Sequence, residues 1–417
     1  MKKEESLQIV IFGATGNLYA DKLARALFLL FEEGDSLPKD FKIIAFARRD
    51  IGTLNFRALT KEYILKKGEV SPDVLEDFLS HIEYFQGELT SKDDFINLKN
   101  YLSTKEADLT MFHLATPSFL YQKIFENIKD SLLYDMGRDI RLMIEKPFGK
   151  DEVDAKKLQE LLASFLGEEQ IYNIDHYLAK ETVRRIPEVR FGNNKTDLWI
   201  PENVSKVKII FHESNVVGSR GSFYDTVGAF RDVGENHMLE MLALVLMDKK
   251  ESEEGEISRK ARASVLNKLY VDDTQPMIKG QYASYLLSPG VESNSKTETF
   301  FRIFLKSHDP RFTDAIFELE SGKGLVDLGS NITSTTVSIN VYLDNGRMEE
   351  FKIQPLPGTS YDSYEKVYAD AINGNQDLFV SMDEIVSQWR LADELLEKWK
   401  DMPLIIYKDG SNPKDIR

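Results

Sequence analysis

The chain has 417 residues, 42% of them hydrophobic, which is enough for a large core and for about two domains. With 53 lysines and arginines against 69 aspartates and glutamates its formal charge is −16, so we expect neither nucleic acid nor a membrane surface as a partner. It has no cysteine, which excludes disulfides, thiolate metal sites and a cysteine nucleophile. The apolar run in the opening “MKKEESLQIVIFGATG” is too short for a signal peptide or a membrane span, so the expected compartment is the cytoplasm.

The first 175 residues alternate short apolar runs with amphipathic helical patterns. The strand-like runs are “QIVIF”, “KIIAFAR”, “LTMFHLA”, “IRLMIEKP” and “IYNID”. In the helical pattern “DKLARALFLLFEEG” the expected buried stripe is Leu23, Ala26, Leu27, Leu30 and Phe31, with Gly34 as the C-cap. Because short β-rich runs separated by helices form parallel sheets, residues 1–175 are predicted to be a Rossmann-like domain with a doubly wound parallel sheet.

Residues 176–417 are predicted to be a second, α+β domain. From about residue 200 the chain shows long alternating strands without intervening helices, namely “VSKVKIIFHES”, “TETFFRIFLKS”, “DAIFELESGKG”, “TSTTVSINVYLDNG” and “EEFKIQP”, which is typical of a large, mainly antiparallel sheet. Helices are expected at 234–248, buried, and at 382–399. The charged stretch 247–262 is predicted to be a solvated loop or an exposed helix. We expect a homodimer, because a large apolar sheet face needs a cover.

A glycine turn follows the first strand. In “IVIFGATGNLYADKL” Gly13 and Gly16 lie between a strand and a helix, where a missing Cβ lets the backbone approach a pyrophosphate. Tyr19 stands where a third glycine is often found. A plain tight turn is the alternative interpretation.

Two arginines follow the second strand, where an acidic residue commonly binds the adenosine 2′-hydroxyl. Guanidinium groups at Arg48 and Arg49 suit a 2′-phosphate instead, so NADP is favoured over NAD, with use of both left open. Thr15 and Lys22 could add donors nearby. The alternative is that both arginines are solvated surface charges.

Further along, “LMIEKPFGK” brings Lys146 to the end of a predicted strand, where cofactor and substrate meet in open parallel sheets. Lys146 is therefore a candidate for contacting the nicotinamide side or a sugar hydroxyl. A lysine at a surface turn is the alternative.

The stretch “IYNIDHYLAKE” gathers four polar side chains of different kinds. If a helix begins after Asp175, then His176 and Lys180 share a face and form, with Tyr177, a donor cluster for a phosphate dianion. Asp175 cannot belong to an anion site. It is better explained as the partner that orients a histidine elsewhere and fixes its tautomer.

That histidine is His237, in “VGAFRDVGENHMLEML”, where a neutral imidazole at the start of a buried helix could act as a general base. A structural hydrogen-bonding role is the alternative. Asp232 and Glu213 are candidate acceptors for sugar hydroxyls, and Lys323 in “ESGKG” adds a second cation.

Together these motifs resemble the glucose-6-phosphate dehydrogenase family. “GATGNL”, “FARR”, “ATPSFLY”, “EKPFG”, “IDHYLAKE”, “FRDVGENHML” and “SGKGL” occur in the order of that family from residue 9 to about 325, and “YDSYEKVYADAINGNQDLFV” looks like a later family segment. The resemblance implies oxidation of D-glucose 6-phosphate at C1 to 6-phospho-D-glucono-1,5-lactone with NADP, the first step of the oxidative pentose phosphate pathway, without a metal.

The resemblance also implies a role for each candidate residue. His237 would be the base and Asp175 its partner, and Glu213 and Asp232 would bind the sugar hydroxyls. The implied phosphate and substrate contacts are His176, Tyr177, Lys180 and Lys323, with Lys180 also close to the chemistry and Lys146 between cofactor and substrate. The implied cofactor contacts are Gly13, Thr15, Gly16, Asn17, Leu18, Lys22, Arg48 and Arg49.

The chain also departs from the family pattern. Asn173 and Ala179 replace an arginine and a glycine common in the “RIDHYLGKE” block, and “VDLGSNITSTTVSINVYL” replaces an expected basic stretch after Lys323. These differences leave open a modified hexose phosphate as the substrate. Two other readings stay open: an oxidoreductase of another sugar, for which Lys180 and Lys323 would matter little, and a non-catalytic NADP-binding sensor.

Overall fold

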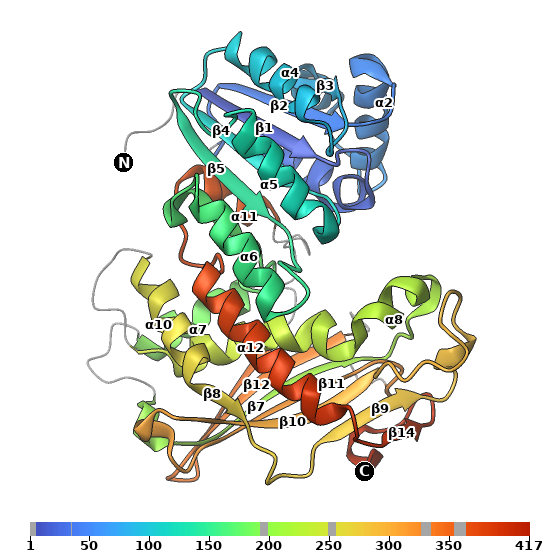
Figure 1. Ribbon diagram of the computed structural model, residues 1–417, viewed down its shortest axis with the longest axis vertical. Helices are drawn as coiled ribbons and strands as arrows, with labels where there is room; N and C mark the ends of the chain where they lie inside the picture. Colours follow the sequence, from blue (N-terminus) through green and yellow to red (C-terminus); the bar gives the residue numbers. More distant parts are fainter. Residues whose placement is uncertain (1–5, 35, 192–198, 249–255, 327–334, 354–363) are drawn as a thin grey trace. The chain divides into compact units, whose positions relative to one another are not determined.

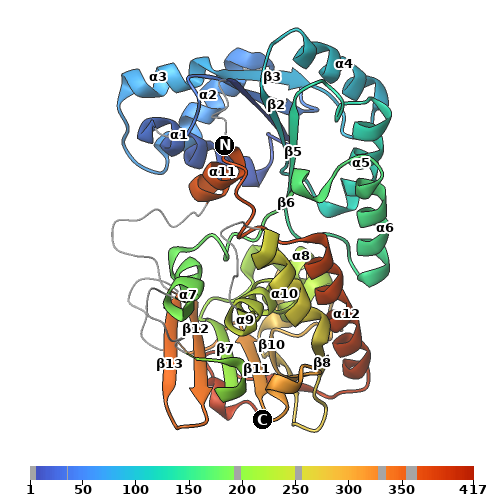
Figure 2. The same cartoon turned by 90° about the vertical axis from the view of Figure 1, so that its left-hand side faces the viewer.

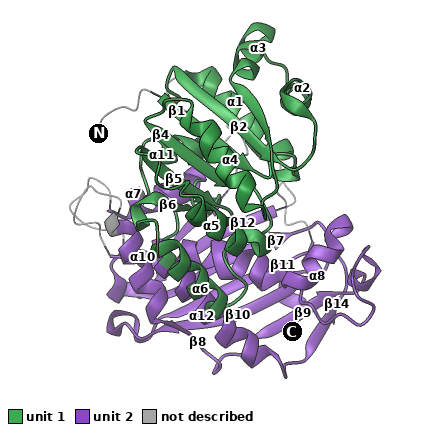
Figure 3. Ribbon diagram, turned by 45° about the horizontal axis from the view of Figure 1, so that its top comes forward, with its two compact units in different colours: residues 1–179, 360–382 green, residues 180–359, 383–417 purple. Residues whose placement is uncertain are grey.

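The computed structural model describes residues 6–34, 36–191, 199–248, 256–326, 335–353 and 364–417 (Figure 1). The chain forms two compact units (Figure 3). The first contains residues 1–179 and 360–382, and the second contains residues 180–359 and 383–417. The first unit is therefore built from two stretches that are far apart in the sequence. Among the described residues, no helix is long and apolar enough to cross a membrane.

The first unit contains a six-stranded parallel sheet with the order β3-β2-β1-β4-β5-β6. Its strands are β1 (Ser6–Phe12), β2 (Asp40–Ala47), β3 (Ile82–Gln86), β4 (Leu109–Leu114), β5 (Asp139–Ile144) and β6 (Ile171–Asn173). All five strands expected from the sequence are present, and only β3 was not anticipated. The strand order reverses between β1 and β4, which is the topological switch point of a doubly wound sheet. The predicted Rossmann-type architecture is confirmed.

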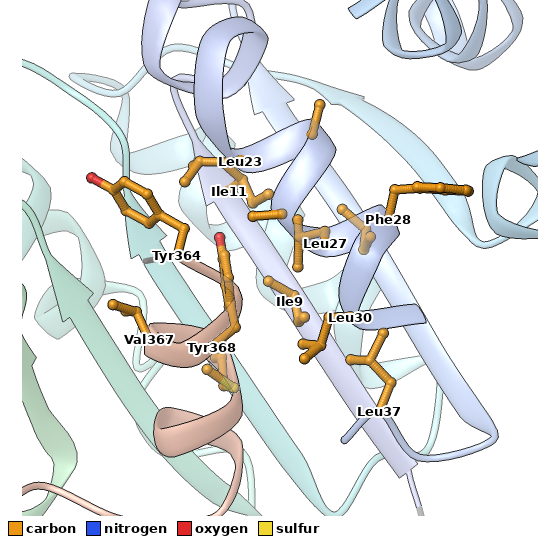
Figure 4. Close-up of a cluster of buried hydrophobic side chains, with 14 of the residues drawn as sticks. Ile9, Ile11, Leu23, Leu27, Phe28, Leu30, Leu37, Tyr364, Val367 and Tyr368 are labelled. Atoms are coloured by element: carbon orange, nitrogen blue, oxygen red, sulfur yellow. The ribbon is translucent and has the colours of Figure 1, made fainter. Parts of the chain in front are cut away.

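Helices cover both faces of this sheet (Figure 2). They are α1 (Ala24–Glu33), α2 (Gly52–Leu65), α3 (Pro72–Ser80), α4 (Lys92–Ser103), α5 (Tyr121–Asp130), α6 (Glu152–Ala163) and α11 (Tyr364–Ile372). Side chains of α1 and α11 pack on β1 in one buried cluster (Figure 4). On the opposite face, Phe95 of α4 stacks on Phe12 of β1.

The buried stripe of α1 largely follows the predicted pattern. Leu23, Ala26, Leu27 and Leu30 are buried, but Phe31 is only partly buried and Phe28 enters the core instead. Gly34 ends the helix in the left-handed conformation with φ 77°. This conformation is the reason why glycine is favoured at that position.

The second unit contains an eight-stranded sheet with the order β13-β12-β7-β11-β10-β9-β14, and β8 pairs with β10. Its strands are β7 (Val204–Glu213), β8 (Leu269–Val271), β9 (Ile278–Tyr282), β10 (Phe300–Ser307), β11 (Ile316–Gly322), β12 (Thr335–Leu343), β13 (Met348–Ile353) and β14 (Leu404–Tyr407). The pairs β7/β11 and β9/β14 are parallel, and the other pairs are antiparallel. The predicted mainly antiparallel α+β unit is confirmed.

The helices of this unit are α7 (Glu181–Phe191), α8 (Gly221–Ala229), the π-helical η6 (Phe230–Met238), α9 (Leu239–Leu246), α10 (Glu256–Lys268) and α12 (Met382–Trp399). Helix α12 has the predicted bounds. The helix expected at 234–248 starts earlier, as η6, and continues into α9, whose residues are all buried.

One sequence prediction fails at the charged stretch 247–262. Residues 249–255 lie outside the described residues, but α10 carries two buried arginines, Arg259 with 3% and Arg262 with 0% of its surface exposed. The Nε of Arg262 lies 2.5 Å from Glu384 and 3.3 Å from Glu240, both of which are fully buried. The helix is therefore not simply exposed, because carboxylates from α9 and α12 compensate the guanidinium charge in the interior.

The large sheet does not leave the uncovered apolar face that motivated the dimer prediction. Val207, Ile209 and Phe211 of β7 are buried, and helices η6 and α12 pack over this face. On the opposite face Lys208 and Arg302 pair with glutamates of β11. That reason for a homodimer is wrong for the described strands, and the oligomeric state stays a prediction.

Glu320, at the centre of this charged face, shows how the buried charges of the face are stabilised. Burial alone would raise the pKa of Glu320, but a hydrogen bond from His212 and the charges of Lys208 and Arg302 lower the pKa to about 2. The carboxylate is therefore ionised at neutral pH and is part of a compensated network.

Candidate active site

A pocket lies at the carboxyl edge of the first sheet, around its switch point. Its lining comes from the turns after β1, β2, β3 and β4, namely Gly13, Thr15, Gly16, Ala47, Arg48, Arg49, Gly87, Glu88, Leu89, Ala115, Thr116 and Pro117. Open parallel sheets bind ligands at this place. Asn17, Leu18 and Lys22, which were also predicted as cofactor contacts, do not line this pocket.

Gly13 is required by the geometry of the turn. Its φ is 81°, and a Cβ built on it would lie 2.5 Å from the carbonyl oxygen of Ala115. Its amide donates to the carbonyl of Phe46 on β2 at 3.0 Å, which ties the turn to the neighbouring strand. The turn therefore leaves a cradle without side-chain atoms, and this fits the close approach of a dinucleotide pyrophosphate.

Tyr19 occupies the position where a third glycine is often found. It is buried, its ring packs 5.2 Å from that of Phe56, and its hydroxyl lies 3.1 Å from the hydroxyl of Thr60. The residue begins a π-helical turn, η1 (Tyr19–Leu23), ahead of α1. Tyr19 therefore packs this turn against α2.

Arg48 and Arg49 project from the loop after β2 into the pocket lining. Both are exposed, and neither guanidinium makes a hydrogen bond or ion pair with the described part of the chain. An anionic group placed here would therefore meet two guanidinium groups that are not already neutralised. This donor set fits a 2′-phosphate better than a 2′-hydroxyl.

Lys146 follows a buried polar network centred on Glu145 at the end of β5. The carboxylate Oε1 accepts from the Tyr364 hydroxyl at 3.0 Å and lies 3.0 Å from His113 Nε2. His113 Nδ1 lies 2.6 Å from the Tyr368 hydroxyl. With Glu145 ionised, the neutral imidazole protonated on Nε2 satisfies both contacts. Lys146 is therefore joined to a glutamate whose side chain is held firmly in place.

The sequence reasoning missed this network. His113 was noted only as part of a strand, and Tyr364 and Tyr368 only as part of a family segment. A detectable signal was present, because two tyrosines four residues apart on an amphipathic helix share one face. Their partner, however, could not be identified from the sequence.

The condition that a helix begins directly after Asp175 is not met. Residues 176–179 form a turn, and α7 begins only at Glu181. Asp175 is buried, and its Oδ1 accepts from the Tyr177 amide at 2.8 Å, which shapes the turn. The argument that His176 and Lys180 share a helical face is therefore wrong. Asp side chains that bond the amide two residues on favour such turns over helices.

The turn nevertheless brings the rings of His176 and Tyr177 close together in the first unit. The ring of His176 lies 5.0 Å from that of Tyr177 and stacks at 6.5 Å on that of Tyr364. Lys180 begins the second unit, where its carbonyl accepts from the amides of the first turn of α7. Asn173, at the position of the expected arginine, donates to the carbonyl of Val380 at 2.9 Å.

The second unit brings Lys323, Glu213 and Asp232 together. Strands β7 and β11 are parallel, with Gly322 opposite His212, so Lys323 and Glu213 leave the same sheet edge side by side. The Lys323 ammonium forms ion pairs with Glu213 and, at 3.4 Å, with Asp232. It also lies 5.4 Å from the ring centre of the buried Tyr224. Both carboxylates remain partly exposed.

His237 lies in the same unit, in the π-helical segment η6 with Asp232. Only 1% of its surface is exposed. In an α-helix residues five apart point about 140° apart, whereas a π-helix closes hydrogen bonds between residues five apart. The π winding therefore turns Asp232 and His237 toward one side. This kind of winding is common at functional sites.

Glu298 fixes the start of this segment. Its Oε1 accepts from the Phe230 amide at 3.0 Å and its carbonyl accepts from the Ala229 amide at 2.9 Å. Gly228 has φ 75°, and a Cβ there would lie 2.5 Å from the Glu298 carboxylate. Burial raises the pKa of Glu298. The predicted pairing of Asp175 with His237 joins residues of different units and stays a prediction.

The sheet order and the pocket at its switch point place the chain in the class of dinucleotide-binding α/β proteins. Comparison with known proteins narrows this class. Residues 10–185 match the family profile described as glucose-6-phosphate dehydrogenase, NAD binding domain, and residues 188–342 and 333–416 match the profile of the C-terminal domain. The chain belongs to the glucose-6-phosphate dehydrogenase family, and the predicted resemblance is confirmed.

Individual relatives agree with this assignment. The chain is 31% identical to glucose-6-phosphate 1-dehydrogenase of Ceratitis capitata, over 97% of this chain and 88% of the relative. It is also 31% identical to that of Borreliella burgdorferi, over 99% and 97%. A solved glucose-6-phosphate dehydrogenase in complex with its substrate glucose-6-phosphate superposes with a TM-score of 0.86 at 28% identity, covering 99% of this chain and 96% of the other.

Proposed function

We propose that the protein is an oxidoreductase that converts D-glucose 6-phosphate at C1 into 6-phospho-D-glucono-1,5-lactone with NADP. The ion-paired cluster of Lys323 with Glu213 and Asp232 is the observation that carries this proposal, because Asp232 comes from the same π-helical segment as His237. Membership of the glucose-6-phosphate dehydrogenase family supports the substrate, and the two arginines of the dinucleotide pocket, whose guanidinium groups pair with none of the described residues, support the cofactor.

The chemistry assigned to this chain is a proton transfer. The neutral imidazole of His237 takes the proton of the anomeric hydroxyl as a general base, and its burial keeps competing water away. Bound NADP supplies the hydride acceptor. Asp175 is proposed to orient the imidazole and to stabilise its protonated form. Lys146, held next to the fixed Glu145, is proposed to contact both ligands.

The surroundings of Lys323 favour a role at the sugar ring rather than at the phosphate. One ammonium shared by two carboxylates leaves a net negative group, which would repel a phosphate dianion. Ring hydroxyls, in contrast, can donate to the carboxylates and accept from the ammonium. The phosphate is then assigned to His176, Tyr177 and Lys180.

The direct test is to follow reduced nicotinamide absorbance with glucose 6-phosphate and with glucose, each with NADP and with NAD. We expect a fast signal with glucose 6-phosphate that is larger with NADP, and almost none with glucose. Absence of a signal despite NADP binding in a titration would reject glucose 6-phosphate as the substrate and would favour another sugar phosphate.

The two lysines should respond differently to substitution. We expect Lys180→Met to raise the KM for glucose 6-phosphate about 10- to 100-fold, with little effect on the weak oxidation of glucose, because it removes a charge-assisted phosphate contact. Lys323→Met should lower kcat/KM for both sugars. Steady-state kinetics with each sugar decides this. An equal loss from both variants with glucose would contradict the division of roles.

The proposal places the reaction in the cytoplasm, as the first step of the oxidative pentose phosphate pathway, in a homodimer. The compartment is proposed from the short apolar run at the start of the sequence, and the pathway step and the homodimer follow from the family resemblance.

A further inference from the structure

Three consecutive carbonyl groups, at the last residue of β2 and in the loop after it, are held by hydrogen bonds. The carbonyl of Ala47 accepts from the Gly87 amide at 3.0 Å and lies 3.1 Å from the Tyr84 hydroxyl. That of Arg48 accepts from the Gln86 side chain at 3.3 Å. That of Arg49 accepts from the Tyr84 hydroxyl and from the Ile51 amide at 3.2 Å. In an exposed loop, water could bond to these carbonyl groups in many backbone conformations. Because they bond to protein groups instead, the loop is held in one backbone conformation.

Tyr84 is well placed to act as the clamp. Strand β3 pairs with β2 in parallel register, Ala45 opposite Tyr84 and Ala47 opposite Gln86, so the two polar side chains follow each other beside the loop. The Tyr84 ring packs 5.3 Å from that of Phe56, and its amide donates to Thr53 Oγ1 at 3.1 Å. Burial raises the pKa of Tyr84, although Arg49 opposes the shift, and the phenol therefore remains a donor at neutral pH.

In the two arginines, in contrast, it is the backbone that is held by hydrogen bonds. Neither guanidinium is paired within the described residues, and both line the dinucleotide pocket. Long side chains lose rotamer freedom when they bind, and a binding group works best when its attachment point is already fixed. Any side chain that fixes the loop should therefore strengthen the binding of the group that the two arginines contact.

We propose that Tyr84, assisted by Gln86, is a positioning residue for recognition of the adenosine 2′-phosphate. It holds the backbone of Arg48 and Arg49 so that both guanidinium groups face that phosphate, and it thereby sets the preference for NADP over NAD. This inference rests on the proposed function, which makes NADP the cofactor. A purely structural tyrosine would instead affect the binding of both dinucleotides alike.

The test uses the full-length protein and isothermal titration calorimetry with NADP and with NAD. We expect Tyr84→Phe to raise the Kd for NADP about three- to tenfold, the effect of one lost hydrogen bond, and to change the Kd for NAD less than about twofold. Tyr101→Phe is the matched control, because it removes a hydroxyl that bonds Glu83 on the same strand but not the loop. It should leave both Kd values unchanged.

A second pair of variants tests whether Tyr84 acts through the arginines. In a background of Arg48→Ala and Arg49→Ala, adding Tyr84→Phe should no longer change the Kd for NADP. Gln86→Leu should shift NADP binding in the same direction as Tyr84→Phe, and it serves as a further probe if the tyrosine variant folds poorly.

The possible failures are distinguishable. Equal affinity of the unmodified protein for NADP and NAD would refute recognition of the 2′-phosphate itself, and this inference with it. A clear preference for NADP that survives both Tyr84→Phe and Gln86→Leu would refute the inference alone, as would an equal loss of affinity for both dinucleotides.

Discussion

His237→Asn should lower kcat for glucose 6-phosphate oxidation by about two to four orders of magnitude, while the Kd for the sugar phosphate changes only a few-fold. Asparagine keeps a polar side chain in this buried position but cannot accept a proton near neutral pH. The loss should therefore fall on the chemical step. Stopped-flow measurement of nicotinamide reduction, with a separate titration of substrate binding, would check both parts.

His308→Asn is the matched control, because it replaces an exposed histidine of the same unit that stacks on Tyr270. It should leave kcat unchanged. The pH profile adds a stronger criterion: the rise of kcat/KM with pH that reports the free base should disappear in the His237 variant alone. Full turnover in His237→Asn would remove this residue from the proposed mechanism.

Most of the fold could be predicted because local pattern and tertiary structure agree in it. The apolar runs of β1, β2, β4 and β5 are buried on both faces, and such strands are continuous in sequence. Gly13 was recognisable because its conformation and its contact with Ala115 both require glycine. Strand β3 was missed because its burial is incomplete, with only Ile82 fully buried.

The parts of the site that escaped prediction depend on contacts between distant residues. His113 and Tyr368 are 255 positions apart, and Tyr364 and Glu145 are 219 apart, so no local spacing reveals them. The sequence left open whether a helix begins after Asp175, because the four-residue spacing of His176 and Lys180 does not distinguish a helix from a turn followed by a later helix. The Asp175 carboxylate accepts a hydrogen bond from the Tyr177 amide, and this bond stabilises the turn.

The second large expected effect is a loss of stability when the buried arginine of α10, Arg262, is replaced. Arg262→Met should lower the free energy of unfolding by about 3–5 kcal/mol, because it leaves the buried carboxylates of Glu240 and Glu384 without their guanidinium. Methionine retains most of the volume, so the cost comes from charge rather than from a cavity. Glu240 follows His237 by three residues, and the same change should therefore also loosen the helix that carries the proposed base. Urea unfolding monitored by circular dichroism measures the effect.

The pH dependence identifies the cause. Without the arginine, the cost comes from two negative charges held close together in the interior, so the variant should be closest to wild type at low pH and lose stability as pH rises. Lys260→Met on the exposed side of the same helix is the control and should cost little. Adding Glu384→Gln to Arg262→Met should recover part of the loss, since it removes one of the two buried carboxylate charges. A loss that is independent of pH and not recovered by Glu384→Gln would instead assign the effect to packing.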